Sequence, residues 1–180
     1  MASEATQVNA DAERPLILVV LSGGGWYRET RRLLEVCDPR RVRVAYAYGT
    51  HRHHGCAELP TPLPGECHPI HYLGRAHGQP WRYLVNLLWL GRGFVEAYQL
   101  IRRLRPDAVL ALGTAVAVPL FGAARLLRVR CVFVETLTRV RRLSRTGHLI
   151  YRLRLADRFY VQWPKLAKLY PACRFVGSVL

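Results

Sequence analysis

Residues 132–142 read Val-Phe-Val-Glu-Thr-Leu-Thr-Arg-Val-Arg-Arg, an apolar run that changes abruptly to polar and basic side chains. The apolar part, Cys131–Val134, predicts a short strand buried in a parallel sheet. In open α/β sheets, ligands bind at the carboxyl ends of the strands. Here the strand is followed by one carboxylate, two hydroxyl groups and three guanidinium groups, from Glu135, Thr136, Thr138, Arg139, Arg141 and Arg142. This set could hold a sugar and a diphosphate together; the alternative is the basic, solvated start of a helix.

A strand, a glycine turn and a helix precede this stretch near the start of the chain. Pro15–Leu21 is a continuous apolar run, typical of a strand that is buried on both faces. Three glycines and a predicted helix, Trp26–Cys37, follow it. The backbone N–H groups of Gly24 and Gly25 could approach an anion at the helix N-terminus. The pattern is neither a complete G-x-G-x-x-G motif nor a P-loop, so a plain tight turn is the alternative.

Strands and helices alternate along the rest of the chain. The pattern predicts strands at residues 42–48, 107–112, 158–162 and 175–180, and helices at 81–104, 115–127 and 143–155, with a short helix after Trp163 and an irregular loop at 49–69. Such alternation predicts a Rossmann-like α/β fold, a largely parallel sheet with helices on both faces. The length fits a single domain over residues 15–180, preceded by a disordered tail over residues 1–14.

The formal net charge is +15, from 27 basic and 12 acidic residues, and the whole excess lies within residues 67–180. A field of this sign suits a polyanion: nucleic acid, an anionic membrane surface or a phosphate-bearing substrate. Nearly all of the basic residues are arginines, whose planar fork favours bidentate contacts with phosphate and carboxylate. A GC-rich genome would also enrich arginine, so the charge alone leaves the class of partner open.

Cysteine and histidine usage favours a reduced protein without a bound metal. The five cysteines are odd in number and include no C-x-x-C pair, which predicts free thiols in a cytosolic compartment. Histidines and cysteines gather between residues 51 and 71, but their spacing matches no established zinc site. The first residues lack the apolar core of a signal peptide, and no apolar run reaches the roughly 20 residues that span a bilayer.

The longest predicted helix, Trp81–Leu104, has two apolar surfaces in its first half. One is the stripe of a core-facing helix. The other contains two tryptophans and has Arg82 and Arg92 beside it, a combination that suits a headgroup layer or a partner protein. We assign this membrane or partner contact to Trp81, Leu84, Leu88, Trp89 and, at the start of the short helix, Trp163. The alternative is a helix that is simply buried in the core.

Several segments resemble, in order, one family of bacterial proteins. They are Ser22–Glu29, Arg105–Leu110, Gly113–Pro119, Phe133–Val140, Ser144–Tyr151, Asp157–Pro164, Tyr170-Pro171 and Val176–Leu180. They are similar to PssD or CpsF, a glycosyltransferase subunit of capsule and exopolysaccharide biosynthesis. That family is related to the membrane-anchoring subunit of the eukaryotic enzyme that adds the second N-acetylglucosamine to dolichyl diphosphate.

The resemblance implies the N-terminal, acceptor-side half of a GT-B glycosyltransferase. In that family a separate small chain, PssE or CpsG, binds the UDP-sugar. The two chains together transfer a sugar to a polyprenyl-diphosphate-linked saccharide. The resemblance thus implies an enzyme subunit with little activity alone and no cofactor. It would lie peripherally on an anionic membrane surface, at the cytoplasmic face of the inner membrane, and would not bind nucleic acid.

The family places a histidine where this sequence has Trp26, so histidine chemistry is not expected there. We instead predict Glu135 as the base or the ligand of the acceptor hydroxyl, aided by Glu29; the alternative for Glu135 is an ion pair with Arg139. The acceptor diphosphate is assigned to amide, hydroxyl and guanidinium groups of Gly24, Gly25, Thr114, Thr136, Arg139, Arg141 and Arg142. No D-x-D run occurs, so a metal-chelating GT-A mechanism has no support.

Two other functions stay open at this point. The chain could be a non-catalytic scaffold that anchors and activates a catalytic partner at the membrane. It could also be a basic nucleic-acid-binding domain, which only the charge suggests, because none of the usual recognition motifs occurs.

Overall fold

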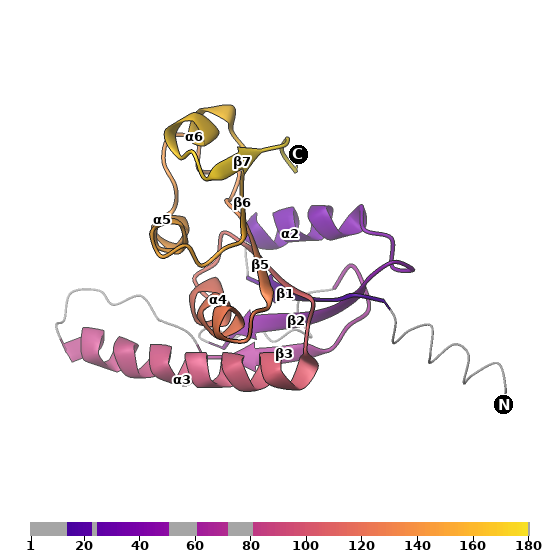
Figure 1. The fold of residues 1–180 in the computed structure, drawn as a ribbon, viewed down its shortest axis with the longest axis vertical. Coiled ribbons are helices and arrows are strands. Elements are labelled where there is room, and N and C mark those ends of the chain that lie inside the picture. Colours follow the sequence, from indigo (N-terminus) through magenta and orange to yellow (C-terminus); the bar gives the residue numbers. More distant parts are fainter. Residues whose placement is uncertain (1–13, 23–24, 51–60, 72–80, 180) are drawn as a thin grey trace, which may run out of the picture.

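A seven-stranded parallel sheet in the order β3-β2-β1-β4-β5-β6-β7 forms the centre of the molecule (Figure 1). The computed structural model describes residues 14–22, 25–50, 61–71 and 81–179, with side chains from residue 90 onward in the last range. The strands are β1 (Leu16–Leu21), β2 (Arg43–Gly49), β3 (Cys67–Ile70), β4 (Ala108–Leu112), β5 (Arg130–Val134), β6 (Arg158–Val161) and β7 (Cys173–Phe175). The helices are α2 (Gly25–Glu35), α3 (Trp81–Leu104), α4 (Ala117–Leu126), α5 (Arg145–Arg152) and α6 (Pro164–Leu169).

β1 lies in the middle of the sheet because its apolar run has no polar face. Leu18 pairs with Ala45 of β2 on one side and with Val109 of β4 on the other. Successive side chains of a strand point to opposite faces. Leu18 accordingly belongs to the core on one face of the sheet and Val19 to the core on the other. Both residues are completely buried, as expected for a central parallel strand.

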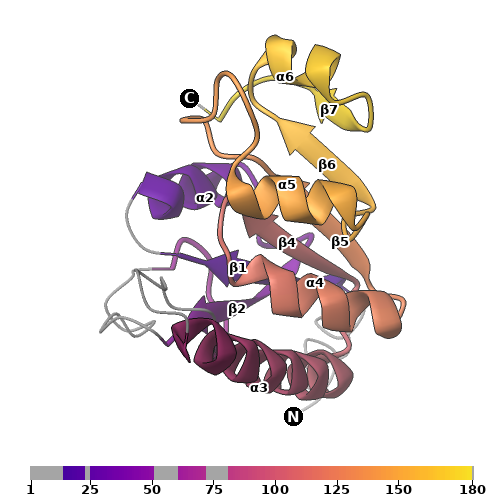
Figure 2. The ribbon, with the colours of Figure 1, turned by 90° about the vertical axis from the view of Figure 1, so that its left-hand side faces the viewer.

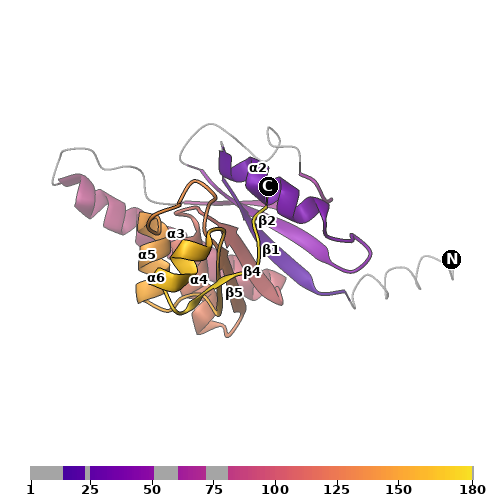
Figure 3. The same cartoon turned by 90° about the horizontal axis from the view of Figure 1, so that it is seen from above.

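Helices cover both faces of the sheet. α3, α4 and α5 lie side by side on one face (Figure 2), and α2 lies on the opposite face (Figure 3). Under the three helices, Phe121 and Phe133 meet edge to face with ring centroids 6.2 Å apart. On the other face, Leu34 of α2 packs in a core with Tyr46. The prediction of a Rossmann-like parallel sheet with helices on both faces is confirmed.

The strand order reverses at β1. From β1 the chain adds β2 and β3 on one side, and α3 then leads back to β4 on the other side of β1. In open parallel sheets, ligands bind where the order reverses, outside the carboxyl ends of the strands. The loops after β1, β4, β5 and β6 therefore define the region in which a site is expected.

The two outermost strands differ from the prediction. We expected an irregular loop over residues 49–69. β3 (Cys67–Ile70) instead begins inside that range and ends one residue after it. It is short and contains Pro69, which an edge strand tolerates because one side of its backbone needs no partner. The last strand occupies Cys173–Phe175 rather than 175–180. Its partner β6 pairs only from Phe159 to Val161, so the chain beyond Phe175 has no strand to pair with.

Helix α5 is shorter than the predicted range of 143–155. It begins after Ser144, whose Oγ accepts a hydrogen bond from the backbone N–H of Gly147 at 2.9 Å. Side chains that accept from the free N–H groups of the first turn favour a helix start at this point. At the other end, Arg154 has a φ of +50°, which a right-handed helix cannot contain.

Three helices are followed by an arginine in the left-handed conformation: Arg105, Arg128 and Arg154, with φ of +48°, +58° and +50°. Glycine avoids the penalty of roughly 1 kcal/mol that a Cβ atom brings there. Arg128 and Arg154 are exposed, so little packing is lost on replacement. We expect Arg128→Gly and Arg154→Gly each to raise the free energy of unfolding by about 0.5 kcal/mol or more.

Arg152→Gly is the matched control, because Arg152 is exposed but lies inside α5. It should lower the free energy of unfolding by about 1 kcal/mol. Urea denaturation followed by circular dichroism measures all three variants. If Arg128→Gly and Arg154→Gly both lowered the free energy of unfolding, the left-handed conformation of these two arginines would be contradicted.

The cysteines are only partly as predicted. Cys37, Cys131 and Cys173 are free thiols. Burial raises the pKa of Cys131 and of Cys173 to about 12, so neither forms a reactive thiolate near neutral pH. Cys67 is disulfide-bonded, so the prediction of thiols at all five positions is wrong there. Spacing along the sequence does not report which sulfur atoms the fold brings together. Cys56 lies outside the described residues, as does the tail over residues 1–13.

Candidate functional site

The carboxylate of Glu29 joins the loops that follow β5 and β6 to helix α2. Its Oε1 accepts a hydrogen bond from Thr136 Oγ1 at 2.6 Å. Its Oε2 accepts from the backbone N–H of Leu137 at 2.9 Å and from Gln162 Nε2 at 2.8 Å. Hydrogen bonds to an ionised carboxylate are among the stronger ones in proteins. Glu29 therefore fixes how α2 sits against the carboxyl edge of the sheet.

Gln162, the residue after β6, extends this network to the end of the chain. Its Nε2 also donates to the backbone carbonyl of Glu135 at 3.0 Å, and its Oε1 accepts from the N–H of Val179 at 2.9 Å. The next residue, Trp163, donates its Nε1 hydrogen to the carbonyl of Leu137 at 2.7 Å. Gln162 is buried, and its amide is fully paired. The segment after β7 is thus held against the loop that follows β5.

Glu135 is completely buried, and its carboxylate holds the start of α5. Oε1 accepts from the N–H of Thr136 at 3.1 Å, and Oε2 accepts from the N–H and Oγ of Ser144 at 2.9 and 3.0 Å. Burial raises the pKa of the Glu135 carboxyl, although these hydrogen bonds and the charge of Arg139 act in the opposite direction. Since Ser144 caps α5, the carboxylate occupies the anion-favouring end of that helix.

Glu135 was predicted as the base or the ligand of the acceptor hydroxyl. No part of the residue is exposed, and both oxygens are occupied by donors from the same chain. Among the described residues, no ion pair joins Glu135 to Arg139; the partners of a structural carboxylate here are Thr136 and Ser144. The geometry makes Glu135 a positioning residue. Its role as the base stays a prediction.

Trp26 packs against the turn that follows β4. Gly113 in this turn has a φ of +60° and no side chain. A methyl group on it would lie 3.0 Å from Cδ1 and 3.1 Å from Nε1 of Trp26, and 3.1 Å from Cβ of Thr136. The adjacent Thr114 is buried, and its Oγ1 accepts from the N–H of Val116 at 3.4 Å. Residues following β1, β4 and β5 therefore meet at Gly113.

The loop of residues 135–144 carries the predicted arginines on its outer side. Three guanidinium groups are exposed, those of Arg139, Arg141 and Arg142. Near the start of the loop, the N–H of Arg139 donates to the carbonyl of Thr136 at 3.0 Å and closes a turn. Glu135 and Ser144, at the two ends of the loop, are hydrogen-bonded to each other. The arginines therefore project from a loop with fixed ends.

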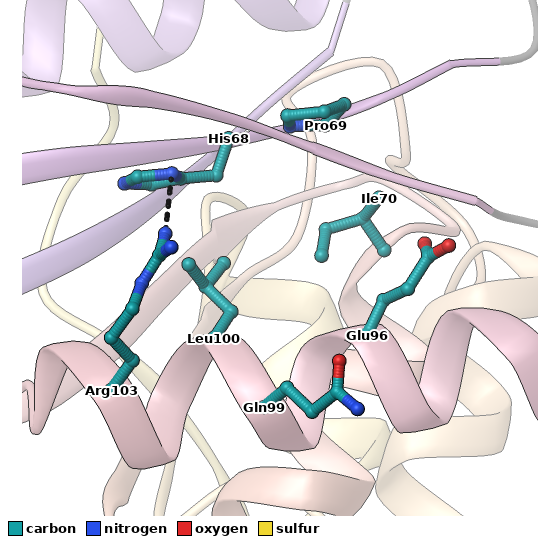
Figure 4. Close-up of a pocket in the computed structure, with 7 residues that line it drawn as sticks. All are labelled: His68, Pro69, Ile70, Glu96, Gln99, Leu100 and Arg103. Atoms are coloured by element: carbon teal, nitrogen blue, oxygen red, sulfur yellow. Dashed lines mark hydrogen bonds between the residues drawn. The ribbon is translucent and has the colours of Figure 1, made fainter.

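A pocket of about 400 Å³ lies elsewhere, between β3 and α3 (Figure 4). Arg103 donates to Nδ1 of His68 at 3.2 Å, and burial lowers the pKa of His68. The neutral ring therefore carries its hydrogen on Nε2, which is buried without a hydrogen-bond partner. Glu66 Oε2 lies 3.5 Å from that nitrogen, beyond a good hydrogen bond. The pocket belongs to the β3 edge of the sheet, away from the network at β5 and β6.

Nearly the whole described part of the chain matches one protein family. Residues 17–179 match the model of the family described as "Oligosaccharide biosynthesis protein Alg14 like". The chain belongs to this Alg14-like family. The chain is 30% identical to mouse "UDP-N-acetylglucosamine transferase subunit ALG14", with 91% of this chain and 82% of the relative covered. The protein of the same name from Yarrowia lipolytica is 29% identical, with 92% and 82% covered.

Solved structures share the fold of this Alg14-like chain at low sequence identity. MurG from Acinetobacter baumannii superposes with a TM-score of 0.64 at 16% identity, covering 84% of this chain and 42% of MurG. A UDP-N-acetylglucosamine 2-epimerase gives a TM-score of 0.62 at 13% identity, covering 92% and 49%. The Alg14-like chain thus spans less than half the length of either protein. Its fold is that of one Rossmann-like half of a GT-B enzyme.

The structure brings most of the predicted site residues to one edge of the sheet. Glu29, Glu135, Thr136 and Trp163 share one hydrogen-bonded network, and Thr114 lies in the neighbouring turn. Gly25 is exposed at the start of α2, whereas Gly24 lies outside the described residues. Two connecting residues were missed, Gln162 and Ser144. Gln162 ends the strand predicted at 158–162 and Ser144 lies in the helix predicted at 143–155, and both lie in segments that carried the family resemblance.

For the predicted membrane or partner contact on α3, the structure describes the backbone but not the side chains. Trp81, Leu84, Leu88 and Trp89 lie in the first part of α3, which has the predicted bounds, but their side chains lie outside the described residues. In the part of the chain that the structure describes, no helix combines the length and apolar character needed to cross a membrane.

Proposed function

We propose that this Alg14-like chain is the acceptor-binding, membrane-associated subunit of a two-chain glycosyltransferase. A small second chain supplies the half that binds the UDP-sugar. The assembled pair moves a sugar from the UDP-sugar to a polyprenyl-diphosphate-linked saccharide at the cytoplasmic face of the membrane. This chain contributes no metal or cofactor to the reaction.

The loop of residues 135–144 is the observation that carries this proposal. It presents three exposed guanidinium groups beside the place where the strand order reverses. A lipid-linked diphosphate is a compact dianion that offers several oxygens to such forks. The buried Glu135 holds both ends of the loop, so the charges are arranged before the acceptor arrives. Preorganisation of this kind lowers the cost of ordering on binding.

Two comparisons support a partner chain. The relatives are named as subunits of a UDP-N-acetylglucosamine transferase. The matched MurG and epimerase chains are more than twice as long as the part that this chain covers. A second Rossmann-like half on a separate chain, of the PssE or CpsG type, would complete the equivalent enzyme. The resemblance to PssD and CpsF favours capsule or exopolysaccharide biosynthesis as the setting.

Glu29 and Glu135 act in this proposal mainly by holding the site together. Both carboxylates accept hydrogen bonds from loops at the carboxyl edge, so neither offers an unoccupied oxygen in this conformation. Catalysis by Glu135 would require the loop to release it. The membrane or partner contact stays assigned to Trp81, Leu84, Leu88 and Trp89 in the first part of α3, and to Trp163.

The engagement of both carboxylates also favours a second function, that of a non-catalytic scaffold. In that case the partner carries every catalytic group, and this chain anchors and activates it. The two functions differ in whether the arginines of the loop touch the acceptor.

Affinity purification of the tagged chain from its native cells in mild detergent tests the two-chain proposal. We expect a small α/β protein to co-purify in near-equal amount, and UDP-sugar transfer to a lipid-linked acceptor to require both chains. Mass spectrometry identifies the partner. Recovery of the chain alone, or with nucleic acid in place of a protein, would overturn the proposal.

A further inference from the structure

Trp26 lies at the carboxyl ends of β1 and β4, the two strands between which the strand order reverses. It is the second residue of α2, just beyond the end of β1, and its indole lies against Gly113 in the turn after β4, the same glycine that Thr136 after β5 lies against. Ligands of doubly wound sheets bind at this place. An aromatic side chain at this place is positioned to contact a bound ligand.

One edge of the indole lies against Gly113, and the side chain as a whole is partly exposed. A Cβ atom on Gly113 would crowd Cδ1 and Nε1 at 3.0 and 3.1 Å, so the absence of a side chain there favours this approach. Trp26 is half-buried overall. Within the described part of the chain, no group accepts the Nε1 hydrogen, and the atom is not sealed from solvent. By contrast, Trp163 donates its Nε1 hydrogen to a backbone carbonyl at 2.7 Å. Trp26 therefore offers both an aromatic face and a donor.

We propose that Trp26 is the platform for the acceptor saccharide: the apolar face of a pyranose ring stacks on the indole, and Nε1–H donates to an oxygen of the same ligand. This inference rests on the proposed function and names the part of the site that receives the sugar. Tryptophan suits such a ligand because it combines a large apolar surface with one polar atom.

The surroundings of Trp26 fit a sugar that is linked to a diphosphate. Thr136, which lies against the same Gly113 as Trp26, accepts a hydrogen bond from the backbone N–H of Arg139 at its carbonyl oxygen. The aromatic side chain and the loop that carries the arginines thus both lie at the carboxyl ends of neighbouring strands. The acceptor has the same order of groups, an uncharged ring followed by two phosphates. The uracil of the donor could also stack on an indole, but in the proposed function the donor binds to the partner chain.

Transfer kinetics of the assembled pair test the platform. The variants are Trp26→Ala, Trp26→Phe and Gly113→Ala, whose methyl group displaces the indole. The varied substrate is a short-chain prenyl-diphosphate N-acetylglucosamine at saturating UDP-sugar. We expect the acceptor KM to rise about tenfold for Trp26→Ala and about threefold for Trp26→Phe, with kcat changed less than about threefold. The KM for UDP-sugar should stay unchanged.

Intrinsic fluorescence gives a second readout that does not depend on turnover. The acceptor analogue should quench the emission of the wild-type chain and should not quench that of Trp26→Phe, although three other tryptophans remain. Quenching by UDP alone, or a rise in the KM for UDP-sugar, would assign the indole to the donor and overturn the inference. Trp26→Phe keeps the test valid if Trp26→Ala fails to fold, which thermal melting shows.

The two proposals fail in different ways. If the wild-type pair transfers sugar and the Trp26 variants keep the acceptor KM and the quenching, the platform is wrong and the proposed function stands. If the wild-type pair shows no transfer with any UDP-sugar, the proposed function is wrong, and the fluorescence titration alone decides whether Trp26 binds the saccharide.

Discussion

A chain in which Arg139, Arg141 and Arg142 are all replaced by glutamine should assemble with its partner but lose about 100-fold in kcat/KM for the acceptor. Each hydrogen bond to a charged group contributes roughly 1.5–3 kcal/mol. Loss of about two such hydrogen bonds to the diphosphate removes about 3 kcal/mol of transition-state stabilisation. This corresponds to a fall of about 100-fold in kcat/KM. The three side chains are exposed, so their replacement should leave the fold intact.

The matched control removes three other arginines from the opposite edge of the sheet. Arg130 and Arg158 begin β5 and β6, Arg152 ends α5, and all three are exposed. Their replacement by glutamine lowers the net charge equally and should change kcat/KM by less than about threefold. Similar losses in both variants would indicate a general field effect. Unchanged transfer in the loop variant, with the pair still assembled, would establish the scaffold function.

The fold was largely predictable because most of its elements have a single strong signal. The run at Leu16–Leu21 has no polar face, and Pro106 stops the helix that ends at Leu104. The outer strands lack such a signal. β3 contains Pro69 and is half exposed, and the extent of β7 depends on where β6 ends rather than on its own residues. Edge strands are defined by their neighbours, which a linear pattern does not contain.

The site was predictable in its location but not in its contacts. The polar residues after Val134 were expected at the carboxyl edge, and they lie there. The burial of Glu135 was not foreseeable, because its partner Ser144 lies nine residues away and meets it only through the path of the loop. The contact between Trp26 and the turn after β4 depends on the left-handed conformation of Gly113, which connects segments far apart in the sequence.

Gly147→Ala should destabilise the protein strongly, although alanine is the better helix former. Gly147 lies in the first turn of α5, where alanine would ordinarily add about 1 kcal/mol of stability. Here a methyl group would overlap Oε2 of Glu135, a buried carboxylate that cannot move without giving up its hydrogen bonds to Ser144. Overpacking of this kind costs about 1–3 kcal/mol, and unpaired buried groups add to it. We expect a net loss of about 3 kcal/mol, seen as a fall of roughly 6–12 °C in Tm.

Gly91→Ala supplies the comparison, because Gly91 also lies within a helix but a methyl group there has, among the described residues, no neighbour within 4 Å outside the backbone of its own helix. It should raise the free energy of unfolding by about 0.5–1 kcal/mol. Opposite signs for the two glycines would follow only if Gly147 is required by the carboxylate beside it. A stabilising Gly147→Ala would mean that Glu135 does not hold the start of α5. The arginine loop would then have no fixed ends, and the preorganised diphosphate site would lose its physical basis.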